Sequence, residues 1–194
     1  HALVAMGKLK RSTDVVQKDA VLLEYTSDGV AMISLNEPHK YNCMSVALMT
    51  RLEEIVREIL QRQLNQRDIV GVIFRGNGSH FCTGGDLLEM KEHVSTDPTV
   101  PDMAARWLVW FPVLLKAIGA PVVTISHGTV VGGGLEMVLI GDARIGVGDA
   151  TYQLGNVARG VTPVGGMCLS LPKAHQNHGA LRHYLTNELV NAPQ

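Results

Sequence analysis

Two short apolar runs, each closed by a glycine-rich turn, constrain the fold of this 194-residue chain most strongly. The first run is IVGVIF at residues 69–74, and the second is VVTIS at residues 122–126. Continuous apolar runs of this length are typical of strands buried on both faces of a sheet. A helical region over about residues 104–118 lies between them. The order strand, helix, strand predicts right-handed crossovers and a largely parallel sheet.

The segments before these runs predict a hairpin and a long helix. Two β-prone stretches, residues 19–24 and 30–35, flank a Ser-Asp-Gly turn. From Ser45 onward, apolar residues recur at helical spacing over about five turns. Glu53 with Arg57 and Glu58 with Arg62 are i,i+4 pairs that support this helix. Residues 95–101 (STDPTVP) are predicted to form a surface loop.

Composition and charge argue against several classes of partner. The chain carries 17 basic and 18 acidic residues without a long block of either sign, so no nucleic-acid-binding surface is expected. No apolar run reaches the length of a membrane span, because glycines interrupt the longest one at residues 132–134. Cys43, Cys82 and Cys168 are widely spaced, which favours a reducing, cytoplasmic location and indicates no metal site.

Length and hydrophobic content fit one domain. With 46% hydrophobic residues, the chain has enough apolar surface for a single core, expected over residues 19–194. Residues 1–18 begin with His and lack a signal-peptide pattern. They are interpreted as an N-terminal extension or a remnant of expression.

Both predicted strands lead into glycines at the edge of the sheet where α/β proteins bind ligands. The first glycine loop is SHFCTGGDLLEM (residues 79–90), and the second is HGTVVGGGLEM (residues 127–137). A glycine leaves its backbone N–H uncovered, and two such groups aimed at one point form an oxyanion hole. The spacing fits neither a dinucleotide fingerprint nor a phosphate-binding P-loop. A structural turn with Glu136 in an ion pair remains the alternative.

The two loops resemble signature stretches of the crotonase (enoyl-CoA hydratase/isomerase) superfamily. GTVVGGGLEMVLIGDARI resembles one stretch, and HFCTGGDLLEM resembles the loop that typically reads Phe-Cys-Ala-Gly-Ala-Asp-Leu. The resemblance extends from the first hairpin to about Leu185. It implies an α/β fold built as a crotonase-like spiral of ββα units, and assembly as a homotrimer. Family members continue past the equivalent of Leu185, so the C-terminal helical region is expected to be truncated here.

The resemblance also implies roles for the residues of these loops. The backbone N–H groups of Gly85 and Gly133 are expected to hold a thioester oxygen, while Glu136 moves a proton. The family's hydratases use a second glutamate twenty positions later, where this chain has Asn156. An amide cannot take up a proton at neutral pH. The prediction therefore shifts from hydration towards isomerisation, dehydration or decarboxylation.

Other polar residues are predicted to contact the substrate or to pack. Lys40 precedes NCMS, which resembles the family's Leu-Asn-Ala-Leu-Ser segment near the CoA entrance, and a lysine there can bind a phosphate. His127 is expected to hold backbone, and His80 and Cys82 are assigned to packing. The predicted substrate-binding residues are Lys40, Tyr41, Thr83 and Asp86.

These features predict an acyl-thioester enzyme that stabilises an enolate. Its partner is an acyl-CoA or an acyl-carrier-protein thioester, and no cofactor is expected beyond the CoA or phosphopantetheine arm of that substrate. One alternative is a polyketide-associated crotonase that dehydrates or decarboxylates a carrier-bound acyl chain. A non-catalytic thioester binder or scaffold is the alternative from another class.

Overall fold

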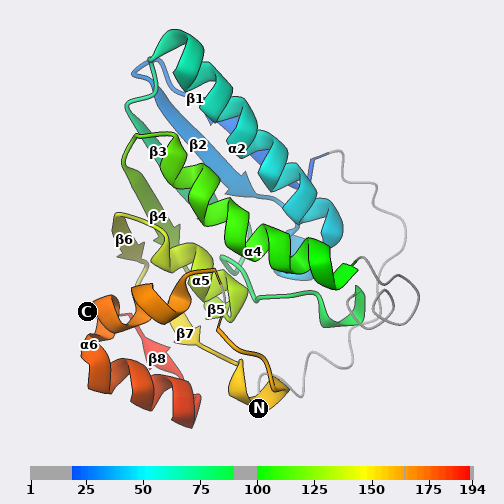
Figure 1. The fold of residues 1–194 in the computed structure, drawn as a ribbon, viewed down its shortest axis with the longest axis vertical. Helices are drawn as coiled ribbons and strands as arrows, with labels where there is room; N and C mark the ends of the chain where they lie inside the picture. The colour runs from blue at the N-terminus through cyan, green and yellow to red at the C-terminus, as the bar shows by residue number, and fades with distance from the viewer. Residues whose placement is uncertain (1–18, 90–99, 164, 193–194) are drawn as a thin grey trace.

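The computed structural model describes residues 19–89, 100–163 and 165–192, and its centre is a five-stranded sheet (Figure 1). The strand order is β1-β2-β3-β4-β6. The first two strands pair antiparallel, and the pairs from β2 to β6 are parallel. This confirms the predicted hairpin and the parallel core. The strands are β1 (Val21–Tyr25), β2 (Val30–Leu35), β3 (Gly71–Gly76), β4 (Val122–Ser126) and β6 (Ala143–Gly146).

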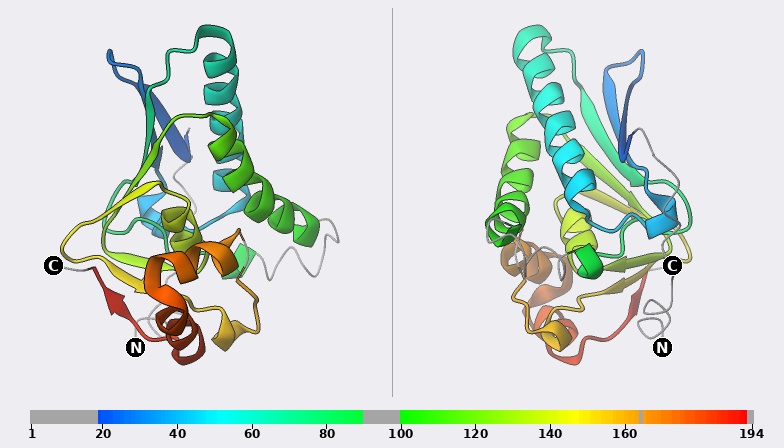
Figure 2. Two further views of the ribbon diagram at one scale, coloured as in Figure 1. Left: turned by 60° about the vertical axis from the view of Figure 1, so that its left-hand side comes forward. Right: turned by 90° about the vertical axis from the view of Figure 1, so that its right-hand side faces the viewer.

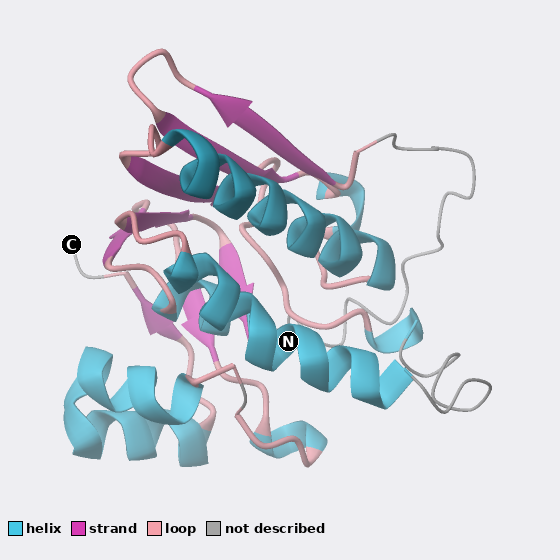
Figure 3. Cartoon of the chain, turned by 45° about the horizontal axis from the view of Figure 1, so that its top comes forward, coloured by secondary structure: helices cyan, strands magenta, loops and turns pink. Residues whose placement is uncertain are grey.

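Two long helices, α2 (Val46–Gln66) and α4 (Val100–Ala117), lie on the same face of this sheet (Figure 3). Ser45 caps α2, because its side-chain oxygen accepts a hydrogen bond from the backbone N–H of Leu48 at 3.1 Å. The helix buries the apolar stripe that the periodicity predicts, formed by Leu48, Met49, Leu52, Ile55, Val56 and Ile59. No helix in the described part of the chain is both long and apolar enough to cross a membrane.

The end of α2 departs from the sequence prediction. Arg62 pairs with Asp68 rather than Glu58, because Arg67 adopts a left-handed conformation (φ 55°) and turns the chain back along the helix. The backbone N–H of Ile69 donates to the side chain of Gln63, so β3 begins two residues later than the apolar run. The predicted loop at residues 95–101 lies outside the described residues, except for two residues that begin α4.

A smaller sheet follows β4 and has the order β5-β7-β8 (Figure 1). Its strands are β5 (Thr129–Val131), β7 (Thr151–Gln153) and β8 (Val190–Asn191). The short helix α5 (Gly133–Leu139) follows β5 directly, and every residue from Gly134 to Leu139 is buried. The second glycine loop therefore comprises β5 and the start of α5, a helix that is buried after its first residue. Residues 1–18, predicted to precede the domain, lie outside the described residues.

The C-terminal arm, defined as residues 157–192, contains η2 (Val157–Arg159) and α6 (Met167–Thr186). Figure 2 shows α6 folding back on itself. The rings of His175 and His183 lie 5.3 Å apart between centroids, whereas eight residues of straight helix rise about 12 Å. Pro172 lies within this helix, and proline disrupts helical hydrogen bonding. Several leucines of the arm are exposed: Leu169, Leu181, Leu185 and Leu189.

Candidate active site

The two glycine loops lie side by side. The backbone N–H of Val131 donates to the carbonyl of Cys82 at 3.2 Å. A Cβ on Gly84, whose φ is 89°, would lie 2.8 Å from the carbonyl oxygen of Val131, and a Cβ on Gly134 would clash with the carbonyl of Cys82. Side chains at these positions would push the loops apart. The glycines are therefore needed for a close approach between backbones.

A third segment, Tyr41–Ser45, borders both loops and is called the entrance segment below. The backbone N–H of Met44 donates to the carbonyl of Gly84 at 2.8 Å, and Met44 forms a parallel bridge with Gly85. Its thioether sulfur lies over the backbone of Gly133, close enough to clash with any Cβ there. The structure thus brings Gly85 and Gly133 to the same methionine, one at its backbone and one at its side chain.

Glu136 lies in the first turn of α5 and is only 3% exposed. It lines a small cavity next to Gly133, with a volume of about 10 Å³, which is room for about one water molecule. The other lining residues are Met44, Met49, Phe111, Pro112, Met137, Ile140 and Gly165. Apart from Glu136, the side chains around this chamber are apolar. A carboxylate in such surroundings is suited to take up or release a proton.

Asn156 lies at the start of η2, next to a segment that packs on the second glycine loop. The backbone N–H of Gly132 donates to the carbonyl of Gln153 at 3.0 Å, and Gly132 also faces the carbonyl of Leu154. Asn156 is 7% exposed, and its side-chain oxygen has no hydrogen-bond partner among the described residues. It does not line the cavity beside Glu136. Its amide oxygen can accept a hydrogen bond but cannot carry a proton.

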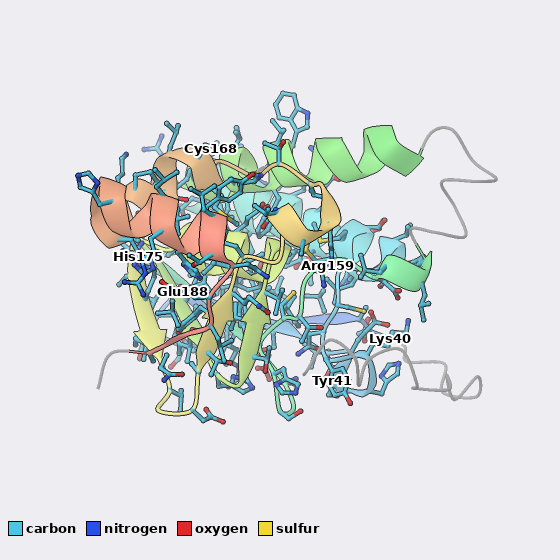
Figure 4. All side chains as sticks on the ribbon, turned by 90° about the horizontal axis from the view of Figure 1, so that it is seen from below. Lys40, Tyr41, Arg159, Cys168, His175 and Glu188 are labelled. Carbon is cyan, nitrogen blue, oxygen red and sulfur yellow. The ribbon has the colours of Figure 1, made fainter. Side chains whose placement is uncertain are left out.

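The predicted substrate-binding residues Lys40 and Tyr41 lie together at one end of the molecule, apart from His175 and Glu188 on the C-terminal arm (Figure 4). Lys40 ends η1 (Pro38–Lys40), and its ammonium lies 3.2 Å from a carboxylate oxygen of the buried Glu37. The lysine is therefore ion-paired within the chain.

The predicted binding residues of the first loop also contact the protein itself. The backbone N–H of Thr83 donates to the carbonyl of Tyr41 at 3.3 Å. One carboxylate oxygen of Asp86 accepts the backbone N–H groups of Leu88 and Glu89, each at 3.1 Å. Asp86 thus caps a turn, and Thr83 fixes the position of Tyr41.

Sequence reasoning did not single out Asn42, which organises the entrance segment. Its side chain is fully buried; the amide oxygen accepts the N–H of Glu37, and the amide nitrogen donates to the carbonyls of Asn77 and His80, all at 2.8 Å. Its φ is 52°, a left-handed conformation that asparagine tolerates better than most residues. No local pattern in the sequence marks this residue, because the two carbonyls that it binds lie 35 and 38 residues away along the chain.

Two histidines make specific contacts with backbone. The Nε2 atom of His127 lies 2.9 Å from the carbonyl oxygen of Gly78, which fits the expectation that this residue holds backbone. The Nδ1 atom of His80 accepts a hydrogen bond from the N–H of Thr129 at 3.0 Å. The assignment of His80 to packing alone was therefore incomplete.

The thiols near the site are held in the protonated form. Burial raises the pKa of Cys82 to about 12. Burial and, next, the Asp86 carboxylate raise the pKa of Cys43 far above its usual value. Neither thiol is suited to act as a nucleophile, since the thiolate is the reactive form. In the described part of the chain, no group of three or more His, Cys, Asp or Glu side chains is arranged to hold a metal ion.

The chain is similar to members of one protein family. The family model for enoyl-CoA hydratase/isomerase matches residues 25–193. YngF of Bacillus subtilis, assigned by name to the enoyl-CoA hydratases/isomerases, is 30% identical over 175 residues, which cover 90% of this chain and 65% of YngF. The mitochondrial Delta(3,5)-Delta(2,4)-dienoyl-CoA isomerase of Rattus norvegicus is 29% identical over 170 residues, which cover 83% of this chain and 49% of the isomerase.

Solved structures agree with these relatives. The crystal structure of an enoyl-CoA hydratase from Bacillus anthracis superposes with a TM-score of 0.79 and 25% identity, covering 90% of this chain and 65% of that protein. The chain thus spans between about half and two thirds of the length of the proteins it matches. The similarities confirm both the resemblance drawn from the two glycine loops and the predicted fold class.

Proposed function

Because the chain belongs to the enoyl-CoA hydratase/isomerase family, we propose that it processes acyl-CoA thioesters through an enolate, with Glu136 as the proton carrier. The backbone N–H groups of Gly85 and Gly133 bind the thioester oxygen. That oxygen gains negative charge as the enolate forms, and a single donor of this kind is typically worth ~3 kcal/mol. The two donors stabilise the negative charge that develops in the transition state more than the neutral carbonyl of the bound substrate, and this difference accelerates the reaction.

The observation that carries the proposal is the position of Glu136 beside Gly133. Both residues line one cavity, and the other side chains that line it are apolar. A thioester whose oxygen is bound at Gly133 has its α-carbon one bond from the carbonyl carbon, within reach of the first turn of α5. The same short helix therefore supplies an oxyanion donor and a base.

We propose double-bond isomerisation as the reaction that fits these residues best. Glu136 removes a proton from the α-carbon of a 3-enoyl thioester, and the electron pair moves towards the thioester oxygen. The same carboxylic acid returns the proton to the γ-carbon, which gives the 2-enoyl thioester and regenerates the carboxylate. This pair of proton transfers needs one ionisable side chain, whereas hydration in the family divides the acid and base steps between two. Asn156 takes no proton in it.

The test of this mechanism is the variant Glu136→Gln, which preserves shape but removes the base. General acid–base catalysis contributes typically ~100-fold to ~10,000-fold, so kcat should fall by about that factor. Deuterium exchange from solvent into the α-carbon of a bound acyl-CoA should slow equally, while equilibrium binding of the thioester stays close to wild type. Equal exchange rates in the two proteins would show that Glu136 is only a structural residue.

A second variant separates isomerisation from hydration. Asn156→Glu restores the carboxylate that the family's hydratases carry at this position, and it should introduce or raise hydration of crotonyl-CoA. Asn156→Gln is the matched control, since its longer side chain cannot ionise. If both variants hydrate crotonyl-CoA equally, the charge at this position does not decide between the reactions.

Two alternatives are tested with the same proteins. A carrier-protein substrate of polyketide type is tested by offering one acyl group on CoA and on an acyl carrier protein.

Non-catalytic thioester binding has one observation in its favour, because the thioether of Met44 covers Gly133 and the cavity beside Glu136 is small. Tight binding of acyl-CoA without α-proton exchange in the wild-type protein would support that alternative. Assembly as a homotrimer stays a prediction.

A further inference from the structure

His80 belongs to the first glycine loop and contacts the other two segments that form the site. Its Nδ1 atom accepts the backbone N–H of Thr129 at 3.0 Å, and its ring packs edge-on against Tyr41, with 5.1 Å between centroids. Its backbone carbonyl accepts a hydrogen bond from the side chain of Asn42 at 2.8 Å. Thr129 begins β5, the strand that leads to Gly133. One residue therefore joins the first glycine loop, the entrance segment and the strand before the second glycine loop.

The bond to Thr129 fixes the protonation state of the ring. A ring nitrogen accepts a hydrogen bond only when it carries no proton, so Nδ1 is unprotonated and the imidazole is neutral with its hydrogen on Nε2. The backbone of β5 passes close to the ring, because a Cβ on Gly128 would lie 2.6 Å from Nδ1. Val131, two residues after Thr129, donates its backbone N–H to the carbonyl of Cys82. The first glycine loop thus holds β5 at both of its ends.

We propose that His80 is a positioning residue: it holds β5 against the first glycine loop, so that the N–H groups of Gly85 and Gly133 meet at one thioester oxygen. The effect of His80 on catalysis rests on the proposed function, whereas the hydrogen bond between His80 and Thr129 is independent of it. His80 does not touch the substrate in this role. A second proton on the ring removes the acceptor and places two N–H groups against each other, so acid should separate the loops.

The groups around the ring favour its neutral form. Burial lowers the pKa of His80 below its usual value of 6.5, and His127 lowers it further. Asp149, which accepts the N–H of Gly128, raises the pKa but does not outweigh these effects. Tyr41 faces the ring edge-on. Because the folded-state pKa is lowered, the bond to Thr129 is complete above pH 6.5 and is lost as the pH falls through the lowered value.

Two substitutions of His80 separate the hydrogen bond from the rest of the ring. Asparagine offers a side-chain oxygen close to the position of Nδ1 and does not titrate, whereas alanine removes the acceptor. His178→Asn is the matched control, because this exposed histidine lies on α6 and does not line the cavity beside Glu136. Hydrogen exchange of the Thr129 amide should be at least ~2-fold faster in His80→Ala, from the lower end of the net worth of one hydrogen bond. It should match wild type in His80→Asn and His178→Asn.

Turnover of an enoyl-CoA provides the second measurement. A misplaced catalytic group costs up to ~100-fold, so kcat in His80→Ala should fall ~10-fold to ~100-fold with little change in KM. His80→Asn should restore most of kcat. It should also shift the acid limb of the pH profile to lower pH, and His178→Asn should leave that limb where wild type has it.

The outcomes are distinguishable. If the Thr129 amide exchanges at the wild-type rate in His80→Ala, the proposed hydrogen bond is wrong. If the amide exchanges faster but kcat is unchanged, the bond exists and His80 has no role in positioning the oxyanion donors. If His80→Ala does not fold, the pH dependence of Thr129 exchange decides, and exchange that responds to acid in the same way in wild type and His80→Asn overturns the proposal. A wild-type protein that neither binds nor turns over any acyl thioester overturns the proposed function and the catalytic consequence of His80 with it. Thr129 exchange then still establishes whether the bond exists.

Discussion

Two clusters of buried polar side chains differ in how completely they are hydrogen-bonded. The entrance cluster, defined as Glu37, Asn42 and Ser45, is 0–6% exposed, and each of its members bonds to another part of the chain. The C-terminal cluster, named for its place in the sequence and not for a contact between its members, comprises Asn156 and His183, which are 7% and 1% exposed. Among the described residues, no partner lies in good hydrogen-bonding geometry for the side-chain oxygen of Asn156 or for either ring nitrogen of His183, although the backbone of Tyr152 and Glu188 lies near the imidazole.

This difference predicts that the entrance cluster holds the geometry of the candidate site, whereas the buried polar groups of the C-terminal cluster add little to the stability of the fold. A buried polar group without a partner costs about 1–3 kcal/mol, whereas a fully bonded network holds its members rigid. The entrance cluster links η1, the first glycine loop and α2, and it lies beside the packed core of α2. The C-terminal arm combines a buried histidine whose ring nitrogens lack well-formed hydrogen bonds with several exposed leucines. We therefore expect substitutions to have opposite effects in the two clusters.

The largest effect is expected for Asn42→Ala, which breaks the bonded cluster. The substitution removes three hydrogen bonds and leaves the N–H of Glu37 and two carbonyls without this partner. It also places alanine at a φ of 52°. The free energy of unfolding should fall by ~3 kcal/mol or more, since several buried groups lose their partner together. Urea unfolding measures the change.

The matched control is Asn65→Ala on the exposed surface of α2, where the asparagine accepts one hydrogen bond from Gln61. This variant should change the unfolding free energy by less than ~0.5 kcal/mol, as surface substitutions usually do. A similar loss in both variants would mean that the entrance cluster contributes no more than an ordinary surface contact.

The opposite effect is expected for His183→Leu in the C-terminal cluster. Leucine of similar size needs no hydrogen-bond partner, so the substitution should raise the free energy of unfolding by about 1–2 kcal/mol at neutral pH. Equilibrium unfolding followed at pH 7 measures this gain. The hydrogen bond between Ser126 of β4 and Tyr152 of β7, which joins the two sheets, should remain, because neither of its atoms belongs to His183.

The pH dependence of the same variant gives a second test. Burial, and next His175, lower the pKa of His183 below 6.5, although the Glu188 carboxylate and the nearby backbone of Tyr152 and Glu188 oppose the shift. The unfolded chain therefore binds a proton at a higher pH than the folded chain does, and this part of the stability is lost as the pH falls below 6.5. His183→Leu removes that dependence, so the stability gain should widen in acid. A gain that stays constant from pH 7 to 5 contradicts the assignment.

The sequence predicted the sheet and α2 well because their signals are local. Hydrophobic periodicity and the serine cap place α2, and the run VVTIS coincides with β4. Contacts formed at the ends of elements were harder to predict. The left-handed Arg67 redirects Arg62 towards Asp68, and no pattern along the helix encodes that turn.

The candidate site shows the same limit. The glycines and Glu136 stand out as a pattern, and the structure places Gly133 and Glu136 around one cavity. The role of Asn42 depends on carbonyls 35 and 38 residues away, and the bond of His80 joins residues 49 apart. Single polar residues whose partners lie this far along the chain carry no signal that distinguishes them from surface residues. Their function emerges only when the loops are brought together.

The smallest effect is expected at the rim of the entrance cluster, for Lys40. Its ammonium is bound to Glu37, so a phosphate of CoA must compete with a buried carboxylate for it. Lys40→Met should raise KM for an acyl-CoA by a few fold and leave kcat nearly unchanged, which is the signature of lost ground-state binding. Methionine is preferred to glutamate here, because a second carboxylate beside Glu37 would disturb the cluster itself.

Glu37→Gln tests the same contact from the other side. Glutamine keeps an oxygen for the hydrogen bond from Ser45 but releases the ammonium of Lys40, so binding of acyl-CoA should tighten if the lysine reaches a phosphate. Both effects should shrink as salt is added, because an exposed charge contact is screened over about 10 Å at 0.1 M ionic strength. The double variant should then bind as Lys40→Met does, since Glu37→Gln acts only through the lysine. If KM rises in both single variants, Lys40 serves to neutralise Glu37, and the entrance cluster ends at an ion pair that has no part in binding the substrate.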